Sequence, residues 1–300
     1  MKPATLPLLC LLALSGAASA TVINFDFNLR LPDDDDSNVA MDTYVGLGAA
    51  PDSPGNTHWN SVRRTSSGNV SSASGLNDNA PGGGPIADSA GVVTTVDILL
   101  TSTTGVAGET SIGHQRSVGQ QELGNSLGYE DLMADFLQLD APGADSAGNL
   151  GTVNGTINGL TAGGLYEIFF YGQSTIYGTP GSSTSGANSF FAITDGLGGS
   201  IIGSGEQTGW DGTNGGNGTL TEGIEYVKLS ATADSSGNIY FIWQNVIAGV
   251  NVGTDSATDG SGGSSDLASL NAIQVVSVPE PSAAFLGGLG LLGLVLRRRR

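Results

Sequence analysis

The chain has 300 residues, 48 of them glycine, and a formal net charge of −18. Between positions 21 and 277, five basic and 27 acidic side chains give a net charge of −22. A surface this negative repels nucleic acid phosphates and so excludes nucleic-acid binding. The one cysteine, Cys10, lies in an apolar N-terminal run, which leaves the rest of the chain without disulfides, thiolate metal sites or cysteine nucleophiles.

The N-terminus has the organisation of a cleavable signal peptide. A single lysine precedes an apolar run from Leu6 to Leu14, and small residues follow, with alanine at Ala18 and Ala20. The run is too short to span a bilayer, and the two alanines suit the narrow pocket of signal peptidase. We therefore predict a signal peptide at residues 1–20, which signal peptidase cleaves before Thr21.

Residues 21–276 show the pattern of an all-β domain. Apolar and polar residues alternate from Ile23 to Leu29, which predicts a half-buried strand. Segments 151–160 and 165–172 are typical of the two strands of a hairpin. Only Glu130 to Asp140 has helical spacing, which predicts one short helical turn. Further strands are predicted at residues 91–104, 189–194, 199–203, 226–231, 239–246 and 270–276.

The number and spacing of these segments indicate the fold class. About ten short strands, separated by Gly, Ser, Thr and Asn, are expected in a two-sheet architecture. We therefore predict an all-β fold in which a single β-sandwich of the jelly-roll type occupies residues 21–276.

The C-terminal end has three parts, each with a physical role. Pro279-Glu280-Pro281 cannot join a helix or sheet, so this segment stays extended and accessible to an enzyme. Residues 283–296 are apolar, small or glycine, and as a transmembrane helix of about 21 Å they span a bilayer core of about 30 Å only marginally. Cytoplasmic arginines then stop translocation. They are Arg297, Arg298, Arg299 and Arg300.

This tripartite end resembles the PEP-CTERM sorting signal, with the motif at 279–281, the membrane segment at 283–296 and the basic end at 297–300. The resemblance covers residues 277–300 and implies that a membrane enzyme, exosortase, processes the tail. It also implies a transient tether to the inner membrane, followed by delivery to the outer cell surface or an extracellular polysaccharide matrix. A plain C-terminal membrane anchor is the alternative.

The body is similar to uncharacterised galactose-binding-like β-sandwich domains of other PEP-CTERM proteins. The similarity is carried by Tyr44–Asp52 with Trp59-Asn60, by Gly159–Gly172 and by Asn271–Val275. It implies a fold that often binds carbohydrate. These positions have the character of strand and turn residues, so none is assigned a binding role.

Motifs for catalysis are missing from the sequence. His58 and His114 lie far apart, there is no Gly-x-Ser-x-Gly elbow, and Lys228 is the only lysine between residues 21 and 277. We predict that the protein is not an enzyme. An exported polysaccharide hydrolase or lyase is the alternative, because 27 acidic residues include many possible carboxylate pairs.

Two kinds of ligand site are candidates. Calcium would find hard oxygen ligands in the acidic run Asp33, Asp34, Asp35 and Asp36 or in Asp234–Asn238, although a solvated acidic loop is the alternative. Trp210 lies in a polar loop and is the candidate for stacking on a sugar ring. Trp243 is expected in the core, and Trp59 is expected to pack at a strand edge.

Three functions follow from these observations. The first is a non-enzymatic component of the cell surface or extracellular matrix. The second is a carbohydrate-binding module that engages extracellular polysaccharide. The third is the exported hydrolase or lyase.

Overall fold

A computed structural model of the chain describes residues 20–27, 46–50, 58–62, 86–102, 111–116, 132–133, 135–140, 150–172, 188–209, 219–247, 249–251 and 267–279. The chain divides into two compact units, one made of Thr21–Ser277 and the other of Met1–Ala20 together with Val278–Arg300. All the strands described below belong to the first unit.

The described ranges consist mainly of short β-strands. In chain order they are β1 (Val22–Asp26), β2 (Asn60–Ser61), β3 (Asp97–Ser102), β4 (Ser111–Arg116), β5 (Asp135–Asp140), β6 (Thr152–Asn158), β7 (Leu165–Tyr171), β8 (Ser189–Thr194), β9 (Glu206–Gln207), β10 (Tyr226–Thr232), β11 (Ile239–Asn245), β12 (Leu267–Leu270) and β13 (Ala272–Ser277). Within these ranges the strands pair antiparallel, except that β1 and β2 run parallel.

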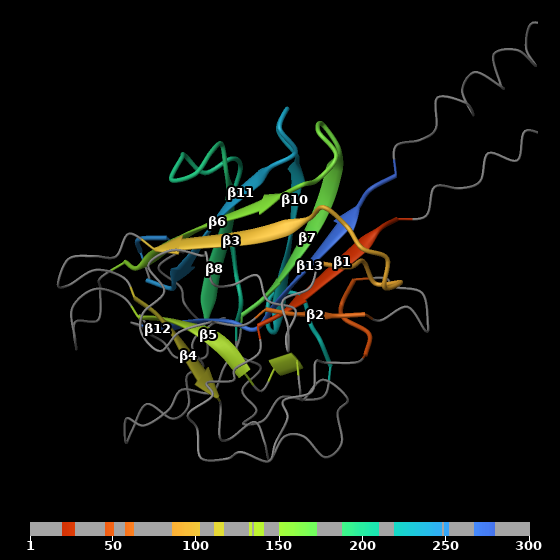
Figure 1. The fold of residues 1–300 in the computed structure, drawn as a ribbon. Coiled ribbons are helices and arrows are strands. Elements are labelled where there is room, and N and C mark those ends of the chain that lie inside the picture. The colour runs from red at the N-terminus through yellow and green to blue at the C-terminus, as the bar shows by residue number, and fades with distance from the viewer. Residues whose placement is uncertain are drawn as a thin grey trace, which may run out of the picture. The chain divides into compact units, whose positions relative to one another are not determined.

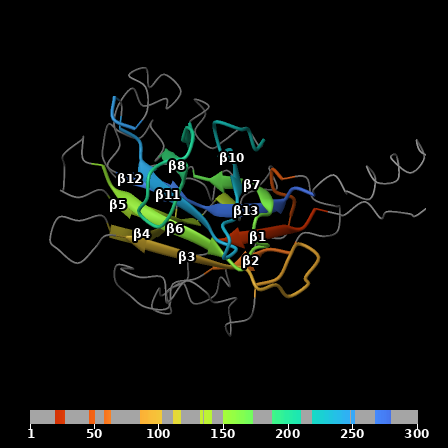
Figure 2. The same ribbon diagram turned by 90° about the horizontal axis from the view of Figure 1, so that it is seen from above.

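The described strands form three sheets (Figures 1 and 2). One five-stranded sheet has the order β10-β7-β13-β1-β2, and a second has the order β3-β6-β11-β8-β9. A smaller three-stranded sheet has the order β12-β5-β4. Neighbouring strands within the large sheets are often distant in sequence, so the fold depends on long-range pairing.

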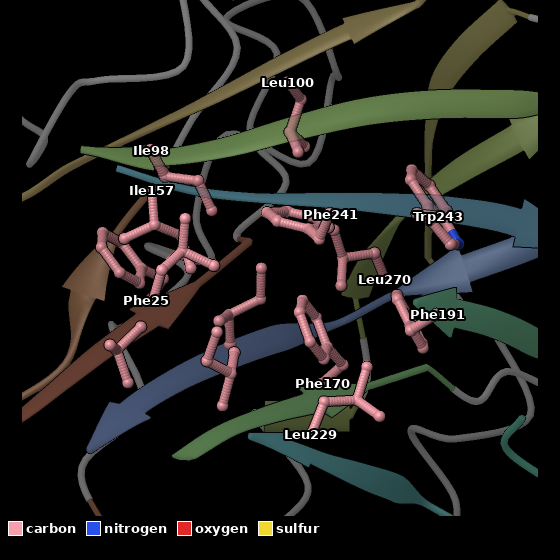
Figure 3. Packing of buried hydrophobic residues seen from close by; sticks show 14 of the residues in the cluster. Phe25, Ile98, Leu100, Ile157, Phe170, Phe191, Leu229, Phe241, Trp243 and Leu270 are labelled. Atoms are coloured by element: carbon pink, nitrogen blue, oxygen red, sulfur yellow. The ribbon is translucent and has the colours of Figure 1, made fainter. Parts of the chain in front are cut away.

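The main hydrophobic core lies between the two large sheets (Figure 3). Phe170 of β7 stacks on Phe191 of β8 at a ring centroid distance of 4.8 Å, and it contacts Phe241 of β11 at 4.9 Å. The three rings are buried and join one sheet to the other. The predicted all-β class is therefore confirmed, and the packing of two sheets around one core is consistent with the predicted β-sandwich.

The predicted hairpin of segments 151–160 and 165–172 is wrong. β6 pairs with β3 and β11 in one sheet, whereas β7 pairs with β10 and β13 in the other. Both strands turn apolar side chains such as Ile157 and Ile168 into the common core. The link between the two strands therefore crosses from one sheet to the other.

The predicted helical turn at Glu130–Asp140 is also largely wrong. Within the described residues of this segment only Leu132 and Met133 are helical, and β5 begins at Asp135. β5 pairs with β4 on one side and with β12 on the other. Tertiary pairing on both edges overrides the local helical spacing.

β1 forms the predicted strand at the N-terminus of the body, but both of its faces are buried. Its inner residues Ile23 and Phe25 join the main core. The outer face lies under a second cluster of buried side chains. That cluster contains Val22, Ala50, Trp59, Leu132, Met133, Phe169, Tyr171, Ala272 and Val276. The expectation of a half-buried strand was therefore wrong in this respect.

β1 and β13 bring the two ends of the sandwich domain together. β13 is hydrogen-bonded to β1 on one side and to β7 on the other, so it lies inside its sheet. At the end of the pair, the backbone N–H of Thr21 donates to the Ser277 Oγ at 2.7 Å, and the Ser277 N–H donates to the Thr21 carbonyl at 2.9 Å. The sheet thus ends where the sorting tail begins.

Candidate functional site

A partly open pocket of about 400 Å³ lies beside the edge strand β10 of one sheet and strand β8 of the other. Its size suits a small ligand. Polar lining residues are Thr194, Asp195, Ser230, Thr232, Asp234, Asn238 and Tyr240, and apolar ones are Leu165, Ile193, Ile202, Ala231 and Ile239. The pocket is therefore mixed in character, with polar groups beside apolar surface.

The turn between β10 and β11 forms one part of the pocket wall. Asp234 Oδ1 accepts hydrogen bonds from the backbone N–H of Ser236 at 2.8 Å and of Asn238 at 2.9 Å. These bonds are the Asx-turn chemistry that Asp, Ser, Gly and Asn favour. Gly237, with φ of 81°, supplies the left-handed conformation that the turn requires. The turn is therefore fixed before any ligand arrives.

The other carboxylate oxygen of Asp234 joins the turn to the strand that follows. Its Oδ2 accepts from the Tyr240 hydroxyl at 3.3 Å, and the same hydroxyl accepts from Asn238 Nδ2 at 3.2 Å. The pKa of Asp234 is lowered, first by the backbone N–H of Asn238 and further by Ser236 and Tyr240. The carboxylate is thus ionised at neutral pH, and both of its oxygens are engaged.

The Asp195 loop forms another part of the wall. Asp195 Oδ1 accepts from the Ser200 backbone N–H at 2.8 Å, and the Asp195 N–H donates to the Ser200 carbonyl at 3.0 Å. A side chain at Gly199 would collide with the Asp195 carboxylate, so the turn depends on glycine there. Asp195 is exposed, yet one of its oxygens is held in place.

Tyr240 is the aromatic side chain available to a ligand. Among the Phe, Tyr and Trp residues of the described ranges, only Tyr226 and Tyr240 are not fully buried. Tyr226 packs against the outer cluster under β7, whereas Tyr240 lines the pocket. Tyr240 was not among the residues predicted from the sequence, although the polar turn just before it was an available signal.

Exposed aliphatic side chains lie beside the polar groups. Leu165 and Ile202 line the pocket and are 42% and 56% exposed. Leu197 and Ile201, from the same loop as Ile202, are exposed as well. A sugar ring presents hydroxyl groups at its edge and C–H groups on its faces, so a wall of this mixed kind is complementary to it.

Most residues singled out from the sequence lie outside the described ranges. They are Ala18, Asp33, Asp34, Asp35, Asp36, Trp210, Glu280, Pro281, the segment 283–296, Arg297, Arg298, Arg299 and Arg300. Thr21 and Pro279 are described, and both are exposed. No helix within the described residues is long and apolar enough to cross a membrane.

The two described tryptophans have structural roles. Trp243 is buried in the main core, as predicted, and its indole N–H donates to the Ser189 Oγ at 3.1 Å. Trp59 is buried in the outer cluster, directly before the short strand β2, and donates to the Gly46 carbonyl at 3.0 Å. Neither presents a ring face to solvent.

The described residues contain no group of three or more His, Cys, Asp or Glu side chains that could hold a metal ion. Asp234, one of the residues considered for calcium, uses its oxygens within its own turn. His58 is exposed. The acidic run at 33–36 remains a prediction, because it lies outside the described ranges.

Residues that carry the similarity of the body meet in a buried hydrogen-bond network on the outer face of β1. Gln274 Nε2 donates to Asn24 Oδ1 at 2.8 Å, and Gln274 Oε1 accepts from the Ala50 N–H and from the Tyr171 hydroxyl. Any side chain at Gly48 would collide with Gln274. The network fastens the 46–50 segment onto the sheet, so its role is structural.

Asparagine at position 60 extends this network to the next loop. Asn60 Nδ2 donates to the carbonyls of Asn24 at 2.9 Å and Ala87 at 2.7 Å, and Asn60 Oδ1 accepts from the Ala87 N–H. Each of these buried polar atoms therefore has a partner, as burial demands.

The lowered pKa of Asp234 leads to a pH-dependent prediction. We expect Asp234→Asn to lower the melting temperature by a few degrees at pH 7, because the ionised carboxylate accepts stronger hydrogen bonds than an amide. The pKa of Asp234 in the folded protein lies below the ordinary value of 3.8. The carboxylate therefore stabilises the fold fully at pH values well above 3.8, and this stabilisation is lost as pH falls from there through the folded pKa. The difference between the two proteins should shrink from about pH 5 to about pH 2. An equal difference at pH 7 and pH 2.5, measured by circular dichroism, would contradict this account.

The fold and the chain end together define an exported β-sandwich protein with a C-terminal sorting tail. Residues 277–300 match the PEP-CTERM protein-sorting motif. The chain is therefore a substrate of exosortase, anchored in the membrane and then processed. The predicted resemblance of the tail is confirmed. No curated protein matches the sequence.

Three solved structures show distant similarity. The carbohydrate-binding module TmCBM27, described in a study of mannan recognition, has 13% identity and a TM-score of 0.28 over 60% of this chain and 89% of its own. The adhesin domain K1 of Lys-gingipain from Porphyromonas gingivalis has 11% identity and a TM-score of 0.26, with coverage of 59% and 89%. The enzymatically active domain of tailspike protein 4 from bacteriophage CBA120 has 11% identity and a TM-score of 0.26, and the match covers 60% of this chain and 19% of the tailspike chain. This chain thus spans about a fifth of that tailspike structure, and none of the three similarities is strong enough to carry an argument.

Proposed function

We propose that the protein is a non-enzymatic component of the outer cell surface or extracellular matrix, and that its sandwich binds polysaccharide at the pocket lined by Tyr240. Signal peptidase removes residues 1–20, exosortase removes the tail, and the domain is delivered outside the cell. The observation that carries the binding proposal is the pocket itself, in which an accessible aromatic ring lies among preorganised polar groups.

The sorting step is tested by deletion of residues 278–300, which leaves β13 intact. In an exosortase-containing host we expect the full chain to lose its tail and reach the surface or matrix. The shortened chain should never enter the membrane fraction and should not reach the surface. Cell fractionation and intact-mass measurement of the product distinguish these states. The proposal fails if both proteins reach the same destination.

Binding is tested with the processed protein purified from the exporting cell. We expect saturable binding to polysaccharide that falls at least about tenfold in Tyr240→Ala, equivalent to about 1.4 kcal/mol, because the ring supplies the stacking surface. Tyr240→Phe is the matched control, since it keeps the ring and loses only the hydroxyl that contacts Asp234. It should retain most of the affinity. If Tyr240→Ala bound polysaccharide as tightly as the wild type, the pocket would not be the binding site.

A polysaccharide hydrolase or lyase gives a different result in the same assay. Asp195 and Asp234 both line the pocket, and a pair of carboxylates is what glycoside hydrolysis requires. Release of reducing ends or unsaturated products by the wild type, abolished in Asp195→Asn, would replace the non-enzymatic proposal. Stable binding without product release supports it.

We also propose that the strands of the sandwich follow a jelly-roll order. A jelly-roll order is supported by the pairing of β1 with β13, which places the beginning and the end of the domain side by side. The antiparallel pairing of β3 with β6 would be a variation on that order.

A further inference from the structure

We propose that the pocket selects uncharged sugars and rejects polysaccharides that carry carboxylate or sulfate groups, with Asp195 as the residue that sets this preference. The inference rests on the proposed function, because it names the class of polysaccharide that the same pocket binds. It follows from the two carboxylates and the exposed aliphatic side chains among the described lining residues.

The charged side chains among the described lining residues are those of Asp195 and Asp234, and both are acidic. The lining described by the structure includes no Lys, Arg or His. Lys228 is the one lysine in the described ranges, and its Nζ lies 3.4 Å from Glu167 Oε1. An anionic sugar in this pocket would place its own carboxylate beside those of Asp195 and Asp234 and would be repelled by them.

Asp195 and Asp234 are not equivalent toward a ligand. Both oxygens of Asp234 accept hydrogen bonds from its own turn and from Tyr240. Asp195 Oδ1 accepts one backbone N–H, from Ser200, and the side chain is exposed. A carboxylate accepts strong hydrogen bonds from hydroxyl groups. The structure thus assigns to Asp195 the recognition of sugar hydroxyls and to Asp234 the support of Tyr240.

The apolar side chains of the pocket favour the same class of ligand. Leu165 and Ile202 are exposed beside the carboxylates. The C–H face of a neutral sugar ring gains from contact with such side chains, whereas a uronate or sulfate group would lose hydration there without a compensating cation. Polar and apolar walls therefore both discriminate against anionic polymers.

The net charge of the domain also repels anionic polysaccharides over a longer range. Added salt weakens this long-range repulsion more than the repulsion inside the pocket, so the two effects can be distinguished. Residues 21–277 carry a net charge of −22, and repulsion over the whole surface is largely screened beyond about 8 Å at physiological ionic strength. Contacts inside the pocket are screened much less. Discrimination that persists at high salt therefore arises at the pocket.

The test compares polymers that differ mainly in charge. Binding of the processed protein to galactan and polygalacturonate, and to dextran and dextran sulfate, is measured by affinity electrophoresis and calorimetry at low and high salt. We expect at least one neutral polymer to bind at least tenfold more tightly than its charged counterpart, at both salt concentrations. Tyr240→Ala should abolish this binding.

Charge variants decide the role of Asp195. Asp195→Asn keeps an acceptor for the Ser200 N–H but removes the charge, so it should weaken neutral binding and reduce the discrimination against the charged polymer severalfold. Glu222→Gln removes an equal charge from an exposed residue that does not line the pocket and should leave discrimination unchanged. Equal effects of the two variants would assign selectivity to net charge and overturn the role of Asp195.

The outcomes separate this inference from the function on which it rests. Preferential binding of polygalacturonate or dextran sulfate, lost in Tyr240→Ala, would overturn the selectivity and keep the pocket as a polysaccharide site. No binding of any of the four polymers, charged or neutral, would count against the proposed function itself.

Discussion

Phe170→Ala should lower the free energy of unfolding by about 3–5 kcal/mol, the usual cost of deleting a buried aromatic ring. The ring is fully buried and contacts Phe191 and Phe241 of the facing sheet at centroid distances of 4.8 and 4.9 Å. Its removal therefore leaves a cavity that neither sheet can fill alone. Domains are stable by only about 5–15 kcal/mol, so the variant should be close to unfolded at growth temperature.

Urea denaturation of the processed protein measures this loss. Phe190→Ala is the matched control, because Phe190 is buried in a small satellite cluster on the other face of the same strand β8. We expect a smaller loss there than for Phe170. Similar losses at both positions would show that the ring contacts between the sheets do not dominate the stability of the sandwich.

A chain that ends after Leu270 should fail to fold at all. It lacks β13, which is hydrogen-bonded to β1 and to β7 and contributes Ile273 and Val275 to the main core. Without it β1 loses its antiparallel partner, and the five-stranded sheet divides into two parts. The loss exceeds the whole stability of an ordinary domain.

The control for this truncation ends at Ser277 and retains every strand. We expect a cooperative melting transition and slow amide exchange in the control, and neither in the shorter chain. A shorter chain that still melts cooperatively would show that β1 and β7 form a stable sheet without β13. Circular dichroism and hydrogen exchange of the two secreted products are sufficient to decide.

Local patterns predicted the strands better than their partners. The strand predicted at 239–246 and the dense apolar run in 165–172 correspond to β11 and β7. Segments 151–160 and 165–172 have the pattern of one hairpin, because strands that are neighbours in sequence usually pair. Only the distribution of apolar faces around the common core reveals that these strands belong to opposite sheets.

The error at Glu130–Asp140 has a related cause. Apolar residues at 132, 133, 136, 137 and 139 fit helical spacing, but they also fit a strand that is buried on both faces. Such a strand has no alternation to distinguish it from a buried helix. The deciding interactions come from β4 and β12, and β12 lies far away along the chain.

The candidate site was predictable only in part. The sequence favoured Trp210 as the sugar-stacking residue, which lies outside the described ranges, and it correctly placed Trp243 in the core. Tyr240 became a candidate because β11 and β8 place its ring beside the loops that carry Asp195 and Asp234. No spacing in the sequence indicates that juxtaposition, since it depends on how β8 and β11 of one sheet lie relative to β10 of the other.

The position of β13 has a consequence for secretion. The strand that completes the middle of its sheet is also the last part of the domain to be synthesised. The sheet cannot be completed before β13 has been made, because β13 is hydrogen-bonded to both β1 and β7. A chain that is exported while it is still being synthesised would therefore start to cross the membrane before its sandwich can close.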